Sequence, residues 1–206
     1  MVAESTLRDE PLPPSATHLC VDMQRLFGPG TEWALAWMPR VLPKIVRLCD
    51  LGPENTIFTR FVPALRPGEG QGTWRRYYQH WASMTLEAVG PDMVELMPEL
   101  AHYVPPAQTL DKPVYSPWWA PDLRQRLRAR DCDTLIISGG ETDMCVLATV
   151  LGAVDLGYRT ILVHDAVCSS SDESHDAMLE LFGRRYSRHV EVGTAAEVAE
   201  LWRIGR

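Results

Sequence analysis

The sequence predicts an α/β protein of three layers, α/β/α, in which helices cover both faces of a mostly parallel sheet of roughly six strands. Short β-branched runs alternate along the chain with longer segments of helical apolar spacing. Apolar residues make up 46% and charged residues 23% of the 206 residues, as in globular proteins. A chain of this length suits one such domain, expected over residues 17–206 after a flexible, proline-rich N-terminal arm, 1–16.

The N-terminal part supplies two strands and one helix. HLCVD at 18–22 is a compact apolar run and predicts the first strand. Residues 33–52 follow with apolar residues at helical spacing, and Pro39 and Pro43 are expected to shorten that helix. NTIFTRF at 55–61 is rich in β-branched and aromatic residues, which predicts the second strand.

Aromatic residues crowd the segment that follows the second strand. Trp74, Tyr77, Tyr78 and Trp81 lie close together in the stretch between two expected strands. This stretch can belong to the core, or it can form a lid over a binding site. The sequence pattern leaves both interpretations open.

From residue 111 onward, strands and helices alternate regularly. The strands are expected where short apolar runs occur, at 111–116, 133–139, 159–166 and 189–194. The helices are expected where apolar residues recur at intervals of three and four, at 121–130, from 142, at 172–185 and at 195–203. Such alternation predicts parallel strand pairing, and open sheets of this kind bind ligands beyond the carboxyl ends of their strands.

Charge and cysteine content narrow the class of partner and compartment. The net charge is −7, and Lys and Arg form no cluster beyond short pairs, which argues against nucleic acid or an anionic membrane as partner. No apolar stretch reaches the roughly 20 residues of a membrane span, and the N-terminal stretch lacks the apolar segment of a signal peptide. Five cysteines without a C-x-x-C pair favour a reduced, cytoplasmic protein.

Three chemically active residues lie at the expected ends of strands. Asp22 ends the first strand, Lys112 lies at the beginning of the third, and Cys145 follows the glycine pair after the fourth. An acid, an amine and a thiol in one cleft form a nucleophilic site. Both the start of a helix and a nearby ammonium favour the thiolate, so we expect Cys145 to be the most reactive of the five thiols.

Three stretches that contain these residues resemble the isochorismatase-like cysteine hydrolases, in the branch that includes amidases and nicotinamidases. The matching stretches are LCVDMQRLF at 19–27, LDKPVYSPW at 110–118 and the long run at 135–179 that begins LIISGGETDMCV. The resemblance implies the Rossmann-like isochorismatase fold and a catalytic Asp-Lys-Cys triad of Asp22, Lys112 and Cys145. It also implies a cis peptide bond between Gly140 and Glu141, and an oxyanion hole made by the backbone amides of Glu141 and Cys145.

The activity implied by this resemblance is hydrolysis of the C–N bond of a small amide or carbamoyl substrate through a thioester. Isochorismatases proper lack the cysteine, so Cys145 favours the amidase side of the family. No histidine follows the second strand until His80, whereas nicotinamidases carry their metal-binding histidines there; we therefore expect no metal and no cofactor. The resemblance further implies a homo-oligomer, a dimer or tetramer. Side chains expected to contact the substrate are Phe27, Arg60, Trp74, Tyr78, Trp81, Trp118 and Trp119.

Two other classes of protein remain as alternatives. One is a small-molecule-binding protein of the same fold that has lost its reaction, which the presence of all three residues of the triad argues against. The other is a dinucleotide-dependent oxidoreductase. That class needs G-x-G-x-x-G after the first strand, but residues 22–28 read DMQRLFG.

Overall fold

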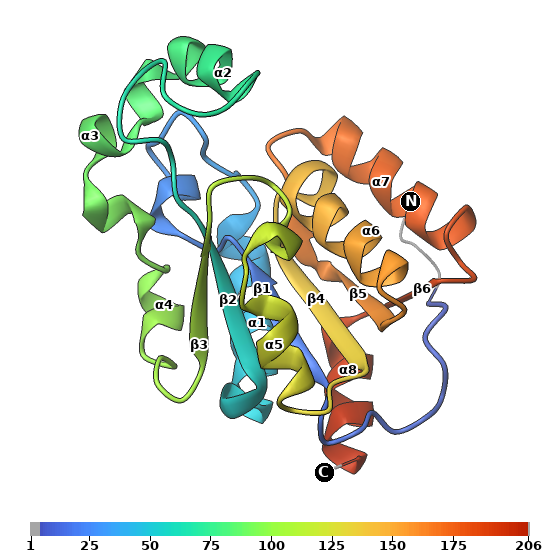
Figure 1. Ribbon diagram of the computed structural model, residues 1–206. Coiled ribbons are helices and arrows are strands. Elements are labelled where there is room, and N and C mark those ends of the chain that lie inside the picture. The colour runs from blue at the N-terminus through green and yellow to red at the C-terminus, as the bar shows by residue number, and fades with distance from the viewer. Residues whose placement is uncertain (1–4, 206) are drawn as a thin grey trace.

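The structure, a computed structural model, describes residues 5–205. Its centre is one sheet in the order β3-β2-β1-β4-β5-β6, and every neighbouring pair is parallel. Helices lie on both faces of the sheet (Figure 1). This architecture confirms the predicted α/β class with three layers. The strands are β1 (Thr17–Val21), β2 (Thr56–Phe61), β3 (Gln108–Lys112), β4 (Thr134–Gly140), β5 (Arg159–Cys168) and β6 (Val190–Gly193).

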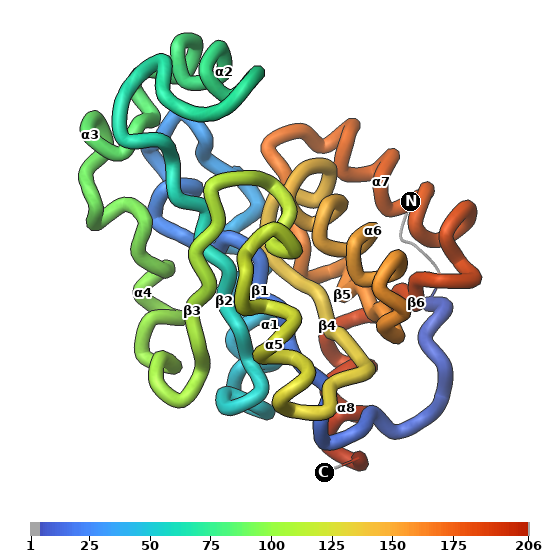
Figure 2. Tube along the Cα trace, viewed as in Figure 1, coloured from blue at the N-terminus to red at the C-terminus, as the bar shows by residue number. Residues whose placement is uncertain are grey.

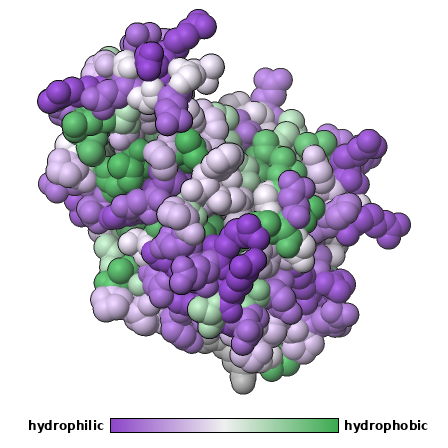
Figure 3. All heavy atoms as spheres, viewed as in Figure 1, coloured by the Kyte–Doolittle hydropathy of each residue, from purple (hydrophilic) through white to green (hydrophobic). Residues whose placement is uncertain are grey.

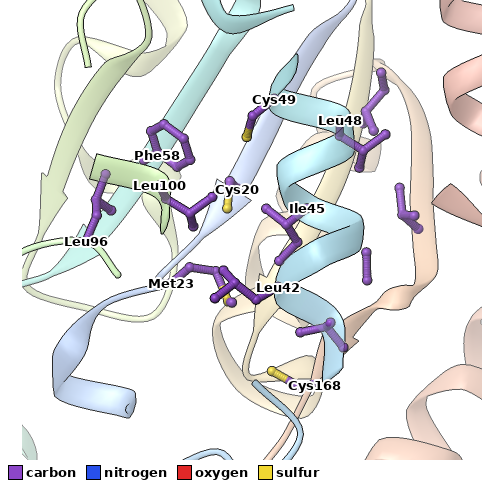
Figure 4. Packing of buried hydrophobic residues seen from close by; sticks show 14 of the residues in the cluster. Cys20, Met23, Leu42, Ile45, Leu48, Cys49, Phe58, Leu96, Leu100 and Cys168 are labelled. Atoms are coloured by element: carbon purple, nitrogen blue, oxygen red, sulfur yellow. The ribbon is translucent and has the colours of Figure 1, made fainter. Parts of the chain in front are cut away.

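Two helices, α1 (Met38–Leu51) and α8 (Ala195–Ile204), pack with the short α4 (Pro98–Ala101) on one face of the sheet. Three helices, α5 (Leu123–Arg128), α6 (Leu147–Asp155) and α7 (Asp172–Arg184), pack on the other face. Figure 4 shows the core under α1, with Ile45 and Leu48 on this helix, Cys20 on β1 and Phe58 on β2, all members of one buried cluster. Because both faces are covered, the central strands β1 and β4 are buried along their whole length.

The connection from β2 to β3 is built from short helices rather than one long one. It contains α2 (Trp74–His80), α3 (Leu86–Val89) and α4, and it runs along the outer side of β3 (Figure 2). Both α2 and α3 lie beyond the carboxyl ends of β2 and β3 (Figure 1). Figure 3 shows polar residues over α2 and α5, and apolar residues over α3 and α6. The aromatic-rich segment of α2 therefore lies at the end of the sheet where a ligand is expected.

Two predicted elements have different boundaries in the structure. Helix α1 begins at Met38 rather than at residue 33, because Pro39 suits the first turn of a helix, where no backbone donor is needed. Pro43 lies inside this helix and does not end it. The sequence suggested a third strand at 111–116, but β3 ends at Lys112. It ends there because Pro113 has no N–H to continue the hydrogen-bonded ladder.

Residues before β1 pack against the end of the chain. The Thr6 amide donates to Val192 O at 2.8 Å, and the Leu12 amide donates to Leu201 O at 3.1 Å. Leu12 is completely buried in the core on the α1 face. The segment predicted as a flexible arm thus makes backbone contacts from Thr6 onward, while residues 1–4 of that arm lie outside the described residues. Within 5–205, no helix has the length and apolarity that crossing a membrane requires.

Candidate active site

The ends of three strands bring Asp22, Lys112 and Cys145 together. Lys112 Nζ lies 2.6 Å from Asp22 Oδ2 and 3.4 Å from Cys145 Sγ. Only 5% of Cys145 and 1% of each of the other two residues is exposed. The sequence suggested that Lys112 lies near the beginning of the third strand, but Lys112 is the last residue of β3. This position puts its side chain at the carboxyl edge of the parallel sheet, the same edge as Asp22.

Thr59 holds the carboxylate of Asp22 in place. Its hydroxyl donates to Asp22 Oδ1 at 2.6 Å, and the Asp22 amide donates back to Thr59 O at 3.2 Å. Asp22 itself has a φ of 49°, a left-handed conformation that Asp tolerates better than most residues. Sequence reasoning missed Thr59, although a threonine in the apolar run of β2 was a signal that a polar partner lies nearby.

The turn between β4 and α6 carries Cys145. Thr142–Val146 form one turn of π-helix, a geometry that is frequent at functional sites. The amides of Met144 and Val146 donate to Glu141 O at 3.1 and 2.9 Å. The peptide bond between Gly140 and Glu141 is cis.

Side chains from α7 and from the end of β5 brace this turn. Thr142 Oγ1 lies 2.8 Å from His175 Nδ1, and the Ser169 hydroxyl donates to Asp143. These two contacts hold the turn against its neighbouring elements.

Glycine at position 139 allows β1 and β4 to approach closely beside the site. Gly139 pairs with Val21, the residue before Asp22, and has a φ of +109°. A Cβ atom at this position would lie 2.1 Å from Val21 O, far inside van der Waals contact. The distance between the acid and the thiol therefore depends on the absence of a side chain here.

Electrostatics favour the protonated form of Cys145. Burial raises the pKa of the Cys145 thiol well above its ordinary value, and the negative charge of Asp22 raises it further, while Lys112 opposes both. The pKa of Lys112 is also raised: burial lowers it, but Asp22 and Cys145 together outweigh burial. The resting site is therefore a neutral thiol beside an ion pair. This corrects the expectation of a thiolate stabilised by the helix and the ammonium, because that expectation left out burial and the charge of Asp22.

An aromatic cluster adjoins the three residues; its members are Phe27, Trp33, Phe61, Trp74, Tyr77, Tyr78, Trp81 and Tyr115. The Phe61 ring centroid lies 5.2 Å from Lys112 Nζ, and Trp74 lies 4.9 Å from the ring of Tyr115. Tyr115 follows Lys112 by three residues, a proximity along the chain that could have identified it. The buried indole N–H of Trp33 has no hydrogen-bond partner among residues 5–205.

Four of the expected substrate contacts belong to this aromatic cluster, namely Phe27, Trp74, Tyr78 and Trp81. The other three have partners of their own or are exposed to solvent. Arg60 pairs with Asp111 and Glu95, at 2.7 and 3.0 Å. The indole of Trp118 donates to Thr149 O at 2.9 Å and stacks on Tyr158, and Trp119 is 81% exposed.

No group of three or more His, Cys, Asp or Glu side chains within residues 5–205 is placed to hold a metal ion. Of the histidines, His18 and His175 bond to Ser138 and Thr142. The geometry supports chemistry by a thiol, a carboxylate and an ammonium in a site largely closed to solvent.

The chain is similar in sequence to known proteins of one family. Residues 16–197 match the family model of the isochorismatase domain. An uncharacterized isochorismatase family protein of Bacillus subtilis, YwoC, is 32% identical over 97 residues, which are 47% of this chain and 51% of that protein. A maleamate amidohydrolase of Pseudomonas putida is 33% identical over 70 residues, which are 34% of this chain and 33% of that protein. The matches therefore span about half or less of these curated relatives.

A solved structure extends the likeness to the whole fold. The crystal structure of a cysteine hydrolase from Pseudomonas syringae pv. phaseolicola superposes with a TM-score of 0.82 at 24% identity and covers 100% of both chains. At this identity the likeness is one of fold. Since the family model covers nearly the full length of the sheet and its helices, the chain belongs to the isochorismatase family.

Proposed function

We propose that this protein is a cysteine amidohydrolase that cleaves the C–N bond of a small amide or carbamoyl substrate. The observation that carries the proposal is the contact of Lys112 with both Asp22 and Cys145, at 2.6 and 3.4 Å. Both charged side chains are buried, whereas most lysines and aspartates lie at the surface. The relative named maleamate amidohydrolase supports the choice of an amide bond.

In the proposed reaction, Asp22 accepts the proton of Cys145 as the sulfur attacks the substrate carbonyl. The raised pKa of the thiol fits this order of events, because the thiolate forms only when a base takes its proton. The backbone amides of Glu141 and Cys145 hold the oxyanion, a contribution of about 10²–10³ in rate. Lys112 compensates the negative charge that the acid and the thiol share.

Breakdown of the intermediate uses the same carboxyl group. Protonated Asp22 donates its proton to the leaving nitrogen, so the C–N bond breaks and a thioester to Cys145 remains. Asp22 then takes a proton from water, whose oxygen attacks the thioester carbonyl. The C–S bond breaks, the acid product leaves, and the thiol is restored. Each proton transfer of this kind contributes about 10²–10⁴ in rate.

An ammonia-release screen tests this proposal. Primary amides, carbamoyl compounds and small cyclic amides are incubated with the wild-type chain, with Cys145→Ala and with Cys132→Ala. For the cyclic amides, whose hydrolysis releases no ammonia, the ring-opened acid is measured instead. We expect turnover by the wild type and by Cys132→Ala, and a loss of about 10³-fold or more in Cys145→Ala. Turnover that survives in Cys145→Ala would exclude the thiol mechanism. Binding of such compounds without any turnover by the wild type would favour the non-catalytic binding protein.

We also propose a single domain over residues 17–206 that works in the cytoplasm as a homo-oligomer. The resemblance in the motifs supports the oligomer, and the exposed ring of Trp119 is of the type enriched at interfaces. Light scattering should then give a mass at least twice the 23.2 kDa of the chain. A species of the chain mass alone would overturn the oligomer.

A further inference from the structure

A second cavity, separate from the catalytic residues, lies between α1, β5 and α7. Its volume is about 410 Å³, within the range of about 300–1,000 Å³ that small-molecule sites occupy. Strand β6 pairs with β5 as far as Val163, whereas β5 continues to Cys168, and the cavity lies beside this continuation. None of the residues that line it is Asp22, Lys112 or Cys145, and none belongs to the aromatic cluster. The cavity is therefore a distinct place for a ligand.

One cation of this cavity has no carboxylate partner. The guanidinium of Arg40 lies over the ring of Trp37, with 4.3 Å between Cζ and the ring centroid, and both residues line the cavity. Within residues 5–205, no ion pair includes Arg40. The other cation of the cavity, Lys44, pairs with Asp165 at 3.3 Å, and Asp165 also accepts from the Ala195 amide at 2.7 Å. Arg40 is thus held in position by an aromatic ring and remains available to an anion.

Two histidines of the cavity add N–H donors. His164 is only 9% exposed, and its ring makes no hydrogen bond with any residue of the described range, 5–205. Burial lowers the pKa of both His164 and His175, so each ring is neutral near pH 7 and keeps one N–H. His175 lies 5.6 Å from the ring of Trp37, and its Nδ1 is 2.8 Å from Thr142 Oγ1. Because a buried polar group without a partner is costly, a ligand oxygen that accepts from His164 would be stabilising.

The rest of the wall is largely apolar. Val41, Val167 and Leu179 line the cavity and are each at most 7% exposed, and the ring of Trp37 continues this surface. Asp176 also lines the cavity, but it is exposed to solvent, where water and salt screen its charge. The lining therefore suits a ligand with an anionic end and an apolar body.

We propose that this cavity binds a small carboxylate with an apolar body, whose carboxylate pairs with Arg40 and accepts from His164. A guanidinium and a carboxylate form charge-assisted hydrogen bonds that are frequently bidentate, which makes this the strongest contact of the site. The body of the ligand packs against Val41 and Leu179, where burial of its apolar surface adds to the affinity. Binding here does not involve the catalytic thiol, so the inference goes beyond the proposed hydrolase function.

Calorimetry with three probe ligands tests the inference. Benzoate has both a carboxylate and an apolar ring, benzyl alcohol has the ring without the charge, and acetate has the carboxylate without the ring. The wild-type protein should bind benzoate at least about tenfold more tightly than either of the other two. Equal affinities for benzoate and benzyl alcohol would overturn the role of the carboxylate. Equal affinities for benzoate and acetate would overturn the role of the apolar wall.

Variants of α1 and β5 locate the bound probe. Arg40→Met should lower the affinity for benzoate at least about tenfold, while the affinity for benzyl alcohol stays within about twofold. Arg47→Met is the matched control, because it removes an exposed guanidinium from the same helix that does not line the cavity, and it should change neither affinity. His164→Phe keeps a ring but removes the N–H, and should lower the affinity for benzoate at least about threefold. Thermal melting checks that the variants are folded.

Failure of this inference is distinguishable from failure of the hydrolase. Cys145→Ala should bind benzoate as the wild type does, although the proposed mechanism predicts that it loses turnover. Benzoate that binds Arg40→Met as tightly as the wild type would lie elsewhere, for example at the catalytic residues, and would overturn the inference. Absence of benzoate binding to the wild type up to about 10 mM would also overturn it.

Discussion

Lys112 and Asp22 form an ion pair with 2.6 Å between Nζ and Oδ2, and the two side chains are 0% and 1% exposed. Removing one partner of a buried pair leaves the other charge without compensation. We expect Lys112→Met to lower the free energy of unfolding by about 3–5 kcal/mol. Urea unfolding at neutral pH measures this value. The double variant Lys112→Met, Asp22→Asn removes both charges and should recover part of the loss. A loss below about 1 kcal/mol in the single variant would contradict this prediction, because ion pairs exposed to solvent contribute no more than that.

The protonated thiol predicts an unusual pH profile for alkylation. Burial, followed by the charge of Asp22, raises the pKa of Cys145, so its thiolate forms only at alkaline pH in the resting protein. The rate of labelling of Cys145 by iodoacetamide should therefore still be rising above about pH 9. Asp22→Asn removes the negative charge and leaves Lys112, so labelling near neutral pH should become faster although turnover is lost.

Mass spectrometry of the labelled peptides checks this profile, with the less buried Cys132 in the same sample as an internal reference. A rate for Cys145 that reaches its plateau by about pH 7 would contradict the prediction and restore the stabilised thiolate.

Gly139 offers a test of how β1 and β4 position the site. A Cβ at this residue would overlap Val21 O, and the φ of +109° adds backbone strain. Gly139→Ala should therefore lower the free energy of unfolding by at least about 3 kcal/mol and reduce turnover. Gly157→Ala is the matched control, because its φ of +83° is similar but no atom lies within 4 Å of the added Cβ. This control should lower the free energy of unfolding by about 1–2 kcal/mol. Equal losses of stability in the two variants, measured by urea unfolding, would count against the close approach.

His18 predicts loss of stability in acid. Burial lowers the pKa of His18 from 6.5 to about 3, so below pH 6.5 the unfolded chain binds a proton that the folded protein does not. The contribution of neutral His18 to the free energy of unfolding is fully present above pH 6.5. It should fall by about 3 kcal/mol when the pH is lowered to about 4. His18→Gln should flatten the dependence of the unfolding free energy on pH, while the exposed His189→Gln should not. A profile of His18→Gln that parallels the wild type would refute the role of this imidazole.

The proposed mechanism predicts activity without a metal. The thiol, once its proton passes to Asp22, is a strong nucleophile, and backbone amides polarise the carbonyl. Turnover of an amide found in the screen should therefore survive prolonged treatment with EDTA or phenanthroline. Loss of turnover on chelation, with recovery on addition of zinc, iron or manganese, would contradict this prediction and favour a nicotinamidase-like site.

Local patterns in the sequence were sufficient to predict much of the fold. The alternation of β-branched runs with helical spacing predicted the parallel sheet and its covering helices, because these periodicities depend on neighbouring residues. The ends of β1 and β4 followed from the same runs, which is why Asp22 and Cys145 could be located at one edge. Short segments were less predictable: the helices α2, α3 and α4 have too few residues for a clear period.

The sequence by itself determined the α/β class, the order of most elements and the chemical types at the strand ends. Only the tertiary structure decided that Lys112 ends its strand and reaches Asp22, 90 residues away, and that Thr59 fixes the same carboxylate from 37 residues away. Local patterns do not encode these contacts because they depend on which strands become neighbours in the sheet. The protonation of Cys145 was likewise decided by tertiary structure, since the pKa of a thiol depends on the burial and the charges that folding assembles around it.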